Sequence, residues 1–105
     1  ILLTAWASLR EPRSTEAVHA AYAARWADEP FVRMLPPATW PETRAVKHSN
    51  RCDLAVSTVH GGRTLLVAAA LDNLVKGAAA QALQNLNLMT GWPEATGLPV
   101  DGRPW

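Results

Sequence analysis

The stretch Leu71–Met89, with the sequence LDNLVKGAAAQALQNLNLM, constrains the fold more than any other part of the chain. Apolar residues recur in it at helical spacing, which predicts one helix with an apolar stripe along one side. Asp72 precedes the repeat and is a favoured N-cap residue, so the helix is expected to cover residues 73–89. The stripe consists of Leu74, Ala78, Ala82 and Leu86, flanked by Val75, Ala79 and Leu83.

The rest of this helix is polar but nearly uncharged. After Lys76 it contains no charged residue, and its polar positions are amides: Asn73, Gln81, Gln84, Asn85 and Asn87. A solvated helix face normally carries charged side chains. Two interpretations stay open: small residues pack the helix tightly against a sheet, or the amide face meets another polar surface at close range.

Composition excludes several classes of function. A chain of 105 residues, 49% of them hydrophobic, fits a single domain with a core of its own. A net charge of +1 without a basic block does not favour a nucleic-acid partner. The single cysteine excludes an internal disulfide and is consistent with a reducing, cytoplasmic environment. Because no apolar run approaches ~20 residues, no membrane span is expected.

The first third of the chain predicts a strand, a helix and a second strand. Ile1–Leu9 is apolar on both faces, which is typical of a central strand covered on each side. Ser14 is expected to cap a helix whose buried stripe contains Val18, Tyr22 and Trp26, and which ends at Asp28-Glu29-Pro30. Phe31–Leu35 is expected to form a brief strand.

The middle of the chain predicts a hairpin. Cys52–Val59 and Thr64–Ala70 have strand character, and Gly61-Gly62 supplies the turn between them. The order of the elements predicts an α+β fold, in which helices cover one face of a mixed, largely antiparallel sheet. The tail from Gly91 to Trp105 is rich in Pro and Gly and is expected to be irregular.

The residues alone do not compose a complete catalytic or metal site. Cys52 stands beside Asp53, whose charge raises a thiol pKa, so a structural role is favoured. His48, Ser49 and Asp53 are triad residue types, but close neighbours in sequence do not generally face one another as a triad must. The three histidines lack metal-ligand spacing.

Three segments resemble a known enzyme family. They are DEPFVRMLP (Asp28–Pro36), SNRCDLAV (Ser49–Val56) and DNLVKGAAAQALQNLNLMTGWPEATGL (Asp72–Leu98). In this order they resemble the C-terminal part of the N-acetyl-gamma-glutamyl-phosphate reductases, in the semialdehyde dehydrogenase superfamily. The resemblance implies that residues 1–105 are a partial C-terminal catalytic and dimerisation domain, truncated at its N-terminus. The helix 73–89 would then pack toward a missing Rossmann domain.

The resemblance also implies an activity. Such enzymes use NADPH to reduce N-acetylglutamyl 5-phosphate to the semialdehyde in arginine biosynthesis. A cysteine thiolate attacks the acyl phosphate, and a histidine acts as acid and base. In the family order both residues lie upstream of the matched segments, while Cys52 matches a cysteine that is not the nucleophile. We therefore expect no catalytic residue in this chain, an inactive fragment when it is alone, and a homo-oligomer.

Three residues are implied as cofactor contacts. Asn73 matches the position that approaches the nicotinamide side of NADP, and its amide can pair with a carboxamide. Gly77 would let the backbone come close, and Gln81 lies further along the same side. Packing roles for Gly77 and Gln81 stay open. The polar run Lys47–Arg51 is a candidate lining of the substrate pocket, although Lys47-His48 departs from the small residue usual before Ser-Asn.

Two alternatives accompany this assignment. The chain can be a non-catalytic module that assembles with itself or a partner through an exposed sheet. Within the superfamily, the aminoadipyl-phosphate reductase of lysine biosynthesis is a close competitor, because the residues that distinguish the two substrates lie mostly outside these segments.

Overall fold

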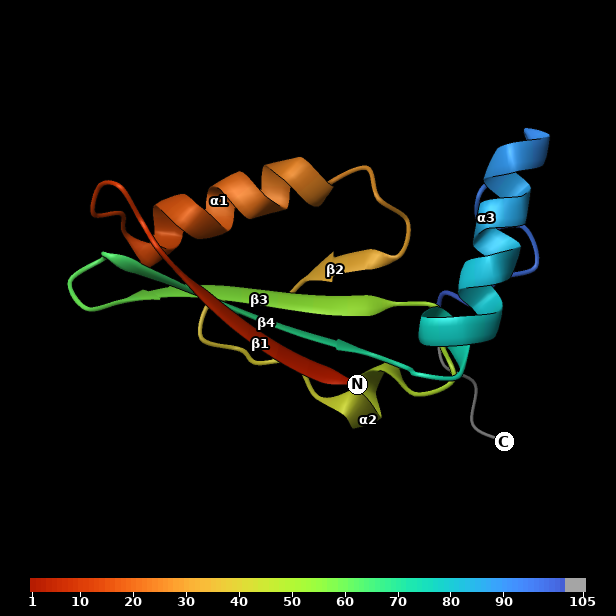
Figure 1. Ribbon diagram of the computed structural model, residues 1–105, viewed down its shortest axis with the longest axis horizontal. Coiled ribbons are helices and arrows are strands. Elements are labelled where there is room, and N and C mark those ends of the chain that lie inside the picture. The colour runs from red at the N-terminus through yellow and green to blue at the C-terminus, as the bar shows by residue number, and fades with distance from the viewer. Residues whose placement is uncertain (102–105) are drawn as a thin grey trace.

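The computed structural model describes residues 1–101, so the part of the predicted irregular tail at 102–105 lies outside the described residues. It is an α+β fold built on one four-stranded sheet (Figure 1). Within residues 1–101 the elements are β1 Leu2–Ser8, α1 Thr15–Trp26, β2 Val32–Met34, α2 Thr43–Val46, β3 Cys52–Val59, β4 Thr64–Leu71, the π-helical turn η1 Val75–Ala79, and α3 Ala80–Thr90.

The sheet has the order β1-β4-β3-β2. β1 and β3 both pair antiparallel with β4, while β2 pairs parallel with β3. The predicted mixed, largely antiparallel sheet is therefore confirmed. The predicted hairpin is also present: Gly61 and Gly62 have φ of 65° and 81° in the turn that joins β3 to β4. A Cβ on Gly62 would lie 2.5 Å from the Arg13 carbonyl oxygen, so this turn needs glycine for close approach as well.

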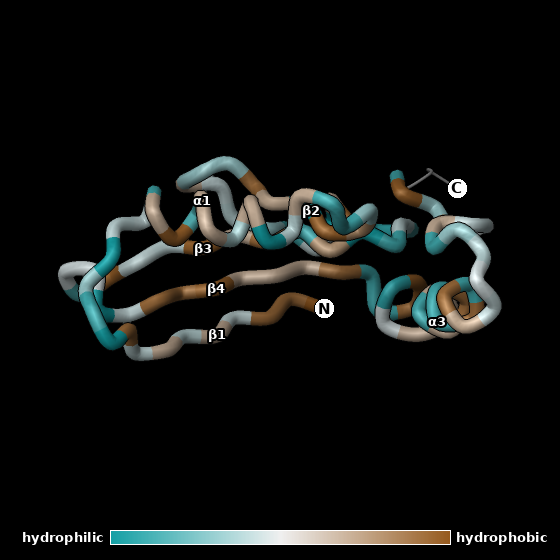
Figure 2. Tube along the Cα trace, turned by 90° about the horizontal axis from the view of Figure 1, so that it is seen from above, coloured by the Kyte–Doolittle hydropathy of each residue, from teal (hydrophilic) through white to brown (hydrophobic). Residues whose placement is uncertain are grey.

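Helix α1 begins as its sequence predicts. The Ser14 hydroxyl accepts a hydrogen bond from the Ala17 N–H at 3.1 Å. Thr15 then ties the helix to the sheet, since its hydroxyl accepts from the Thr58 N–H at 3.0 Å. The predicted stripe is half-buried rather than buried, and α1 contains no fully buried residue. This helix covers the β3 side of the sheet and leaves β4 and β1 uncovered beside it (Figure 2).

The prediction of a central, covered first strand is wrong. β1 lies at the edge of the sheet and pairs only with β4. All seven of its residues are exposed, and Trp6 is 71% exposed. The apolar pattern of this strand is real, but no element among residues 1–101 is available to cover it.

The prediction of one continuous helix over 73–89 is also corrected. β4 extends through Leu71, and two bonds of π spacing follow, from the Gly77 N–H to the Asp72 carbonyl at 3.0 Å and from the Ala79 N–H to the Leu74 carbonyl at 3.2 Å. Only then does α3 begin, and it ends at Gly91, whose φ is 74°.

Both helices were expected on one sheet face, and this too is wrong for α3. The helix stands beyond the end of the sheet, roughly across the strand direction (Figure 1). At its start Ala80 packs with Phe31 and with Leu98 of the returning tail in a small core, against which the half-buried Val75 and Leu83 also lie. The predicted stripe is not the buried side: Leu74, Ala78, Ala82 and Leu86 are exposed, and α3 buries Ala80, Gln84 and Asn87 instead. An apolar stripe does not specify whether, or by which element, it is covered.

Two details of residues 1–101 complete the description. The four-residue helix α2 precedes the turn that leads into β3, and its Val46 is fully buried. None of the described helices combines the length and apolar character that a membrane crossing requires.

The exposed first strand predicts self-association of the isolated chain, because contiguous apolar patches promote contact between molecules. Sedimentation velocity should show dimers or larger species. Trp6→Lys, at the centre of β1, should shift the distribution toward monomer. The matched change Trp92→Lys, at a tryptophan that is 58% exposed but outside the sheet, should have little effect. A heat-stable monomer with the unaltered sequence would contradict this prediction.

Candidate functional site

The candidate site is organised by the carboxylate of Asp72, where β4 ends. Its Oδ1 accepts hydrogen bonds from the N–H groups of Leu74 at 2.8 Å and Val75 at 2.9 Å. These bonds satisfy orphan donors at the start of η1, so the capping role predicted for Asp72 is confirmed. Its Oδ2 accepts a third bond, from the His48 N–H at 2.8 Å. Sequence reasoning did not anticipate this link to a turn 24 residues earlier.

The turn held by Asp72 is a strained one. His48 has φ of 62°, a left-handed conformation that is uncommon for residues other than glycine. The hydrogen bond from its N–H is the largest cause that holds the pKa of Asp72 below its usual value. The Val75 and Leu74 N–H groups act in the same direction, while burial opposes them. Asp72 therefore stays ionised while it joins the turn before β3 to the start of η1.

The structure brings Asn73 and Gly77 together. A Cβ on Gly77 would lie 3.2 Å from Asn73 Oδ1, so the absence of a side chain there leaves room for the Asn73 amide. Within residues 1–101, Gln81 makes no hydrogen bond to Asn73 or Gly77. Its Nε2 donates to Asn85 Oδ1 at 3.5 Å instead. Of the three residues implied as cofactor contacts, the first two thus form a local pair.

Asn73 borders an open cavity of about 280 Å³. Lys47 lines the same cavity from the turn before β3, so two candidate residues from distant parts of the sequence meet there. The complete lining is Ile1, Thr43, Arg44, Lys47, Leu71, Asp72 and Asn73.

The middle of the polar run Lys47–Arg51 faces inward. Ser49 and Asn50 are fully buried, and the Ser49 hydroxyl donates to the Val46 carbonyl at 2.7 Å. Arg51 lies with its Nε 3.0 Å from Asp53 Oδ1. Within this run only Lys47 therefore borders the cavity beside Asn73.

The amide side of the last helix belongs to an internal network. Gln84 Oε1 accepts from Asn50 Nδ2 at 3.1 Å and from Lys76 Nζ at 2.6 Å, and Gln84 Nε2 donates to the Glu94 carboxylate. Asn87 Nδ2 donates to the carbonyls of Glu94 and Thr96, both at 2.9 Å. These buried amides join α3 to the turn before β3 and to the tail. The charge-poor amide row was the signal for this network, because a buried amide can be satisfied without a partner of opposite charge.

Cys52 and Asp53 have structural surroundings. Burial is the main cause that raises the pKa of the Cys52 thiol, Lys76 opposes it and Asp53 adds to it. The Asp53 carboxylate is 1% exposed and binds Arg33 through two hydrogen bonds, one of them from Arg33 Nε to Oδ1 at 2.9 Å. Asp53 is therefore committed to two arginines, and it does not orient a histidine. Residues 1–101 contain no cluster of side chains able to hold a metal ion.

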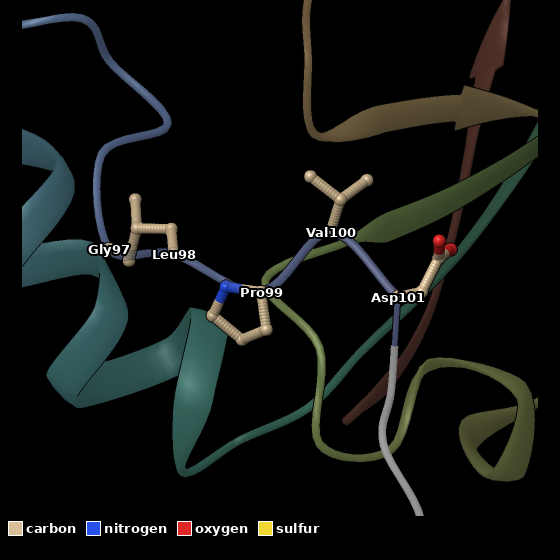
Figure 3. A pocket seen from close by; sticks show the side chains of 5 residues that line it. All are labelled: Gly97, Leu98, Pro99, Val100 and Asp101. Carbon is tan, nitrogen blue, oxygen red and sulfur yellow. The ribbon is translucent and has the colours of Figure 1, made fainter.

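A second hollow, of about 580 Å³, lies along the tail at residues 97–101 (Figure 3). The side chains of Leu98, Pro99, Val100 and Asp101 along it point in different directions rather than toward a common centre. The sole charged member, Asp101, accepts a hydrogen bond from Arg51 at 3.3 Å. The cavity beside Asn73 is therefore the better candidate site.

Comparison with known proteins identifies the family. The family described as "Semialdehyde dehydrogenase, dimerisation domain" matches residues 1–73. The chain belongs to this family.

Its relatives include enzymes named N-acetyl-gamma-glutamyl-phosphate reductase. The one from Moorella thermoacetica is 52% identical over 104 residues, which cover 97% of this chain and 30% of the relative. The one from Acidothermus cellulolyticus is 46% identical over 102 residues, with the same coverage. The one from Laribacter hongkongensis is 53% identical over 79 residues, covering 75% of this chain and 23% of the relative. The chain thus spans about a third or less of the length of these relatives, and the family resemblance found in its sequence is confirmed.

The surroundings of Cys52 predict that its thiol reacts slowly with thiol reagents at neutral pH. Because the thiolate is the reactive form, raising the pKa of Cys52 lowers its reactivity at neutral pH. The rate of modification by a chromogenic disulfide should rise with pH and reach its midpoint above the value of a free cysteine. The denatured chain is the control and should react faster at pH 7. An apparent pKa at or below about 8.5 in the folded chain would contradict the prediction; the chain has one cysteine, so the signal has one source.

Proposed function

We propose that this chain is the C-terminal part of an N-acetyl-gamma-glutamyl-phosphate reductase, which uses NADPH to convert N-acetylglutamyl 5-phosphate to the 5-semialdehyde. The observation that carries the proposal is the 52% identity to the Moorella thermoacetica enzyme of that name across 97% of this chain. The match to that enzyme covers 104 residues, so it also takes in the last helix, which lies beyond the family match at residues 1–73.

The proposed enzyme has its reactive groups in another part of the polypeptide. The relatives are more than three times as long as the matched segment, which leaves room for a Rossmann domain, a cysteine nucleophile and a histidine acid–base. The raised pKa of Cys52 and the pairing of Asp53 with two arginines support the proposal that the reactive groups lie elsewhere. This chain alone is proposed to be inactive, and the complete enzyme to be a cytoplasmic homo-oligomer of arginine biosynthesis.

The cavity beside Asn73 fits one end of the cofactor. Ligand pockets range from roughly 300 to 1,000 Å³, so a cavity of about 280 Å³ suits a nicotinamide ring and not a whole dinucleotide. The Asn73 amide carries both donors and an acceptor, which match those of a carboxamide. NADPH, when bound, supplies the hydride. Asn73 is proposed to orient the ring, Gly77 to keep the approach open, and Gln81 to contribute from further along the helix.

Lys47 is proposed to face the substrate. It alone of the polar run Lys47–Arg51 borders the cavity shared with Asn73, and an ammonium group there favours the approach of an acyl phosphate. Arg44 lines the same cavity and adds positive charge. The nicotinamide and the phosphate-bearing substrate are thus proposed to meet across this cavity.

A non-catalytic assembly module is the second candidate. The uncovered edge strand β1 and the dimerisation role in the family description favour it. An aminoadipyl-phosphate reductase is a third, closely related possibility, but the relatives described above are all named for the glutamyl substrate.

The upstream reading frame and an activity assay test the proposal together. The frame should encode a glycine-rich dinucleotide motif and a cysteine nucleophile. The full-length polypeptide should then reduce N-acetylglutamyl phosphate with NADPH, and prefer it to the aminoadipyl substrate. A frame without both features favours the assembly module, and a preference for the longer substrate favours the lysine enzyme.

Asn73 provides a residue-level prediction. Asn73→Ala in the full-length enzyme should raise the KM for NADPH about five- to tenfold, because a lost hydrogen bond costs about 1 to 1.5 kcal/mol and each 1.4 kcal/mol corresponds to tenfold. Thr39→Ala is the control, since Thr39 is an exposed polar residue that does not line the cavity. Equal KM values for both variants would remove Asn73 from the cofactor site.

A further inference from the structure

We propose that Asp72 is a positioning residue that holds the two walls of the cavity in register, with Asn73 on the cofactor side and Lys47 on the substrate side. This inference rests on the proposed function, and it adds a residue to which neither the sequence resemblance nor the comparisons give a role in the reaction.

The two oxygens of Asp72 serve different walls. Oδ1 accepts from the N–H groups of Leu74 and Val75, which directly follow Asn73. Oδ2 accepts from the N–H of His48, which directly follows Lys47. All three bonds are between 2.8 and 2.9 Å. One carboxylate therefore sets the backbone next to each candidate ligand contact.

The backbone on both sides needs this support. On the substrate side, His48 adopts a left-handed conformation at φ 62°, which is maintained only where the surroundings hold it. On the cofactor side, the chain passes from a strand into a turn of π spacing, with bonds from Gly77 to Asp72 and from Ala79 to Leu74. Such π turns occur frequently at functional sites. Loss of the carboxylate would release both segments.

Other side chains near the cavity do not provide the same link. One group of lining residues belongs to the segment around α2: Thr43, Arg44 and Lys47. In the other group, Leu71 ends β4 and Asn73 follows it. Among the hydrogen bonds of the described residues, Asp72 is the one cavity-lining side chain that bonds to both segments. Its effect on either ligand is therefore indirect, through Lys47 or through Asn73.

The test uses the full-length enzyme with two substitutions at position 72. Asp72→Ala removes both acceptors, and it should raise both the dissociation constant for NADPH and the KM for N-acetylglutamyl phosphate by about tenfold. Asp72→Asn keeps one acceptor oxygen, and Asn caps helices as well as Asp does. It should restore NADPH affinity to within about twofold of the original and leave the KM for the acyl phosphate raised.

A double variant shows whether Asp72 acts through Asn73. Asp72→Ala combined with Asn73→Ala should bind NADPH no more weakly than the weaker single variant, since residues in one network are not additive. Asp28→Asn, at an exposed carboxylate after α1, is the charge-matched control and should leave both constants unchanged. Thermal unfolding of every variant separates a loss of fold from a loss of positioning, and Asp72→Asn carries the test if Asp72→Ala does not fold.

The outcomes separate this inference from the function on which it rests. An unaltered enzyme that neither binds NADPH nor reduces the substrate overturns both. An active enzyme whose two constants are unaffected by Asp72→Ala overturns the role of Asp72 alone. Additive effects of the Asp72 and Asn73 changes, or equal effects of Asp72→Asn on both constants, also overturn it.

Discussion

The antiparallel pairing of β3 with β4 is the constraint on which the site depends. Its register places Cys52 opposite Leu71, so the residues just before β3 must lie beside those just after β4. The Asp72–His48 hydrogen bond follows from this register, as does the cavity shared by Lys47 and Asn73. A one-residue slip would turn each side chain to the opposite face and would separate these groups.

The structure satisfies its buried polar groups in two ways. At the start of β3, the Asp53 carboxylate is paired with two arginines. Under α3, the pairing relies mostly on amides, with Gln84 between Asn50 and Glu94. Lys76 donates to the same amide, and burial lowers the pKa of its ammonium group. The network explains why Gln84 and Asn87 are amides: both are buried against protein, where an unpaired charge would cost more than a bonded amide.

Predictions that depend on local chemistry were confirmed, and those that depend on coverage were not. The Ser14 cap, the Gly61-Gly62 turn and the Asp72 cap each involve residues a few positions apart, so the sequence contains the whole interaction. The exposed β1 and the displaced α3 depend on which distant surface covers an apolar pattern. An apolar pattern indicates that a face of a helix or strand is suited to burial, but its period does not identify the element that packs against that face.

The sequence by itself determined the α+β class, the hairpin, the helix caps and the family. The family resemblance also pointed to Asn73 as a cofactor contact, and that role stays a prediction. Tertiary structure alone decided that Gly77 leaves room for the Asn73 amide, that Lys47 turns toward the same cavity while Ser49 and Asn50 turn inward, and that Asp72 bonds to both walls. The contacts between Lys47–His48 and Asp72–Asn73 join residues more than twenty positions apart, and the register of β3 against β4 brings these residues together.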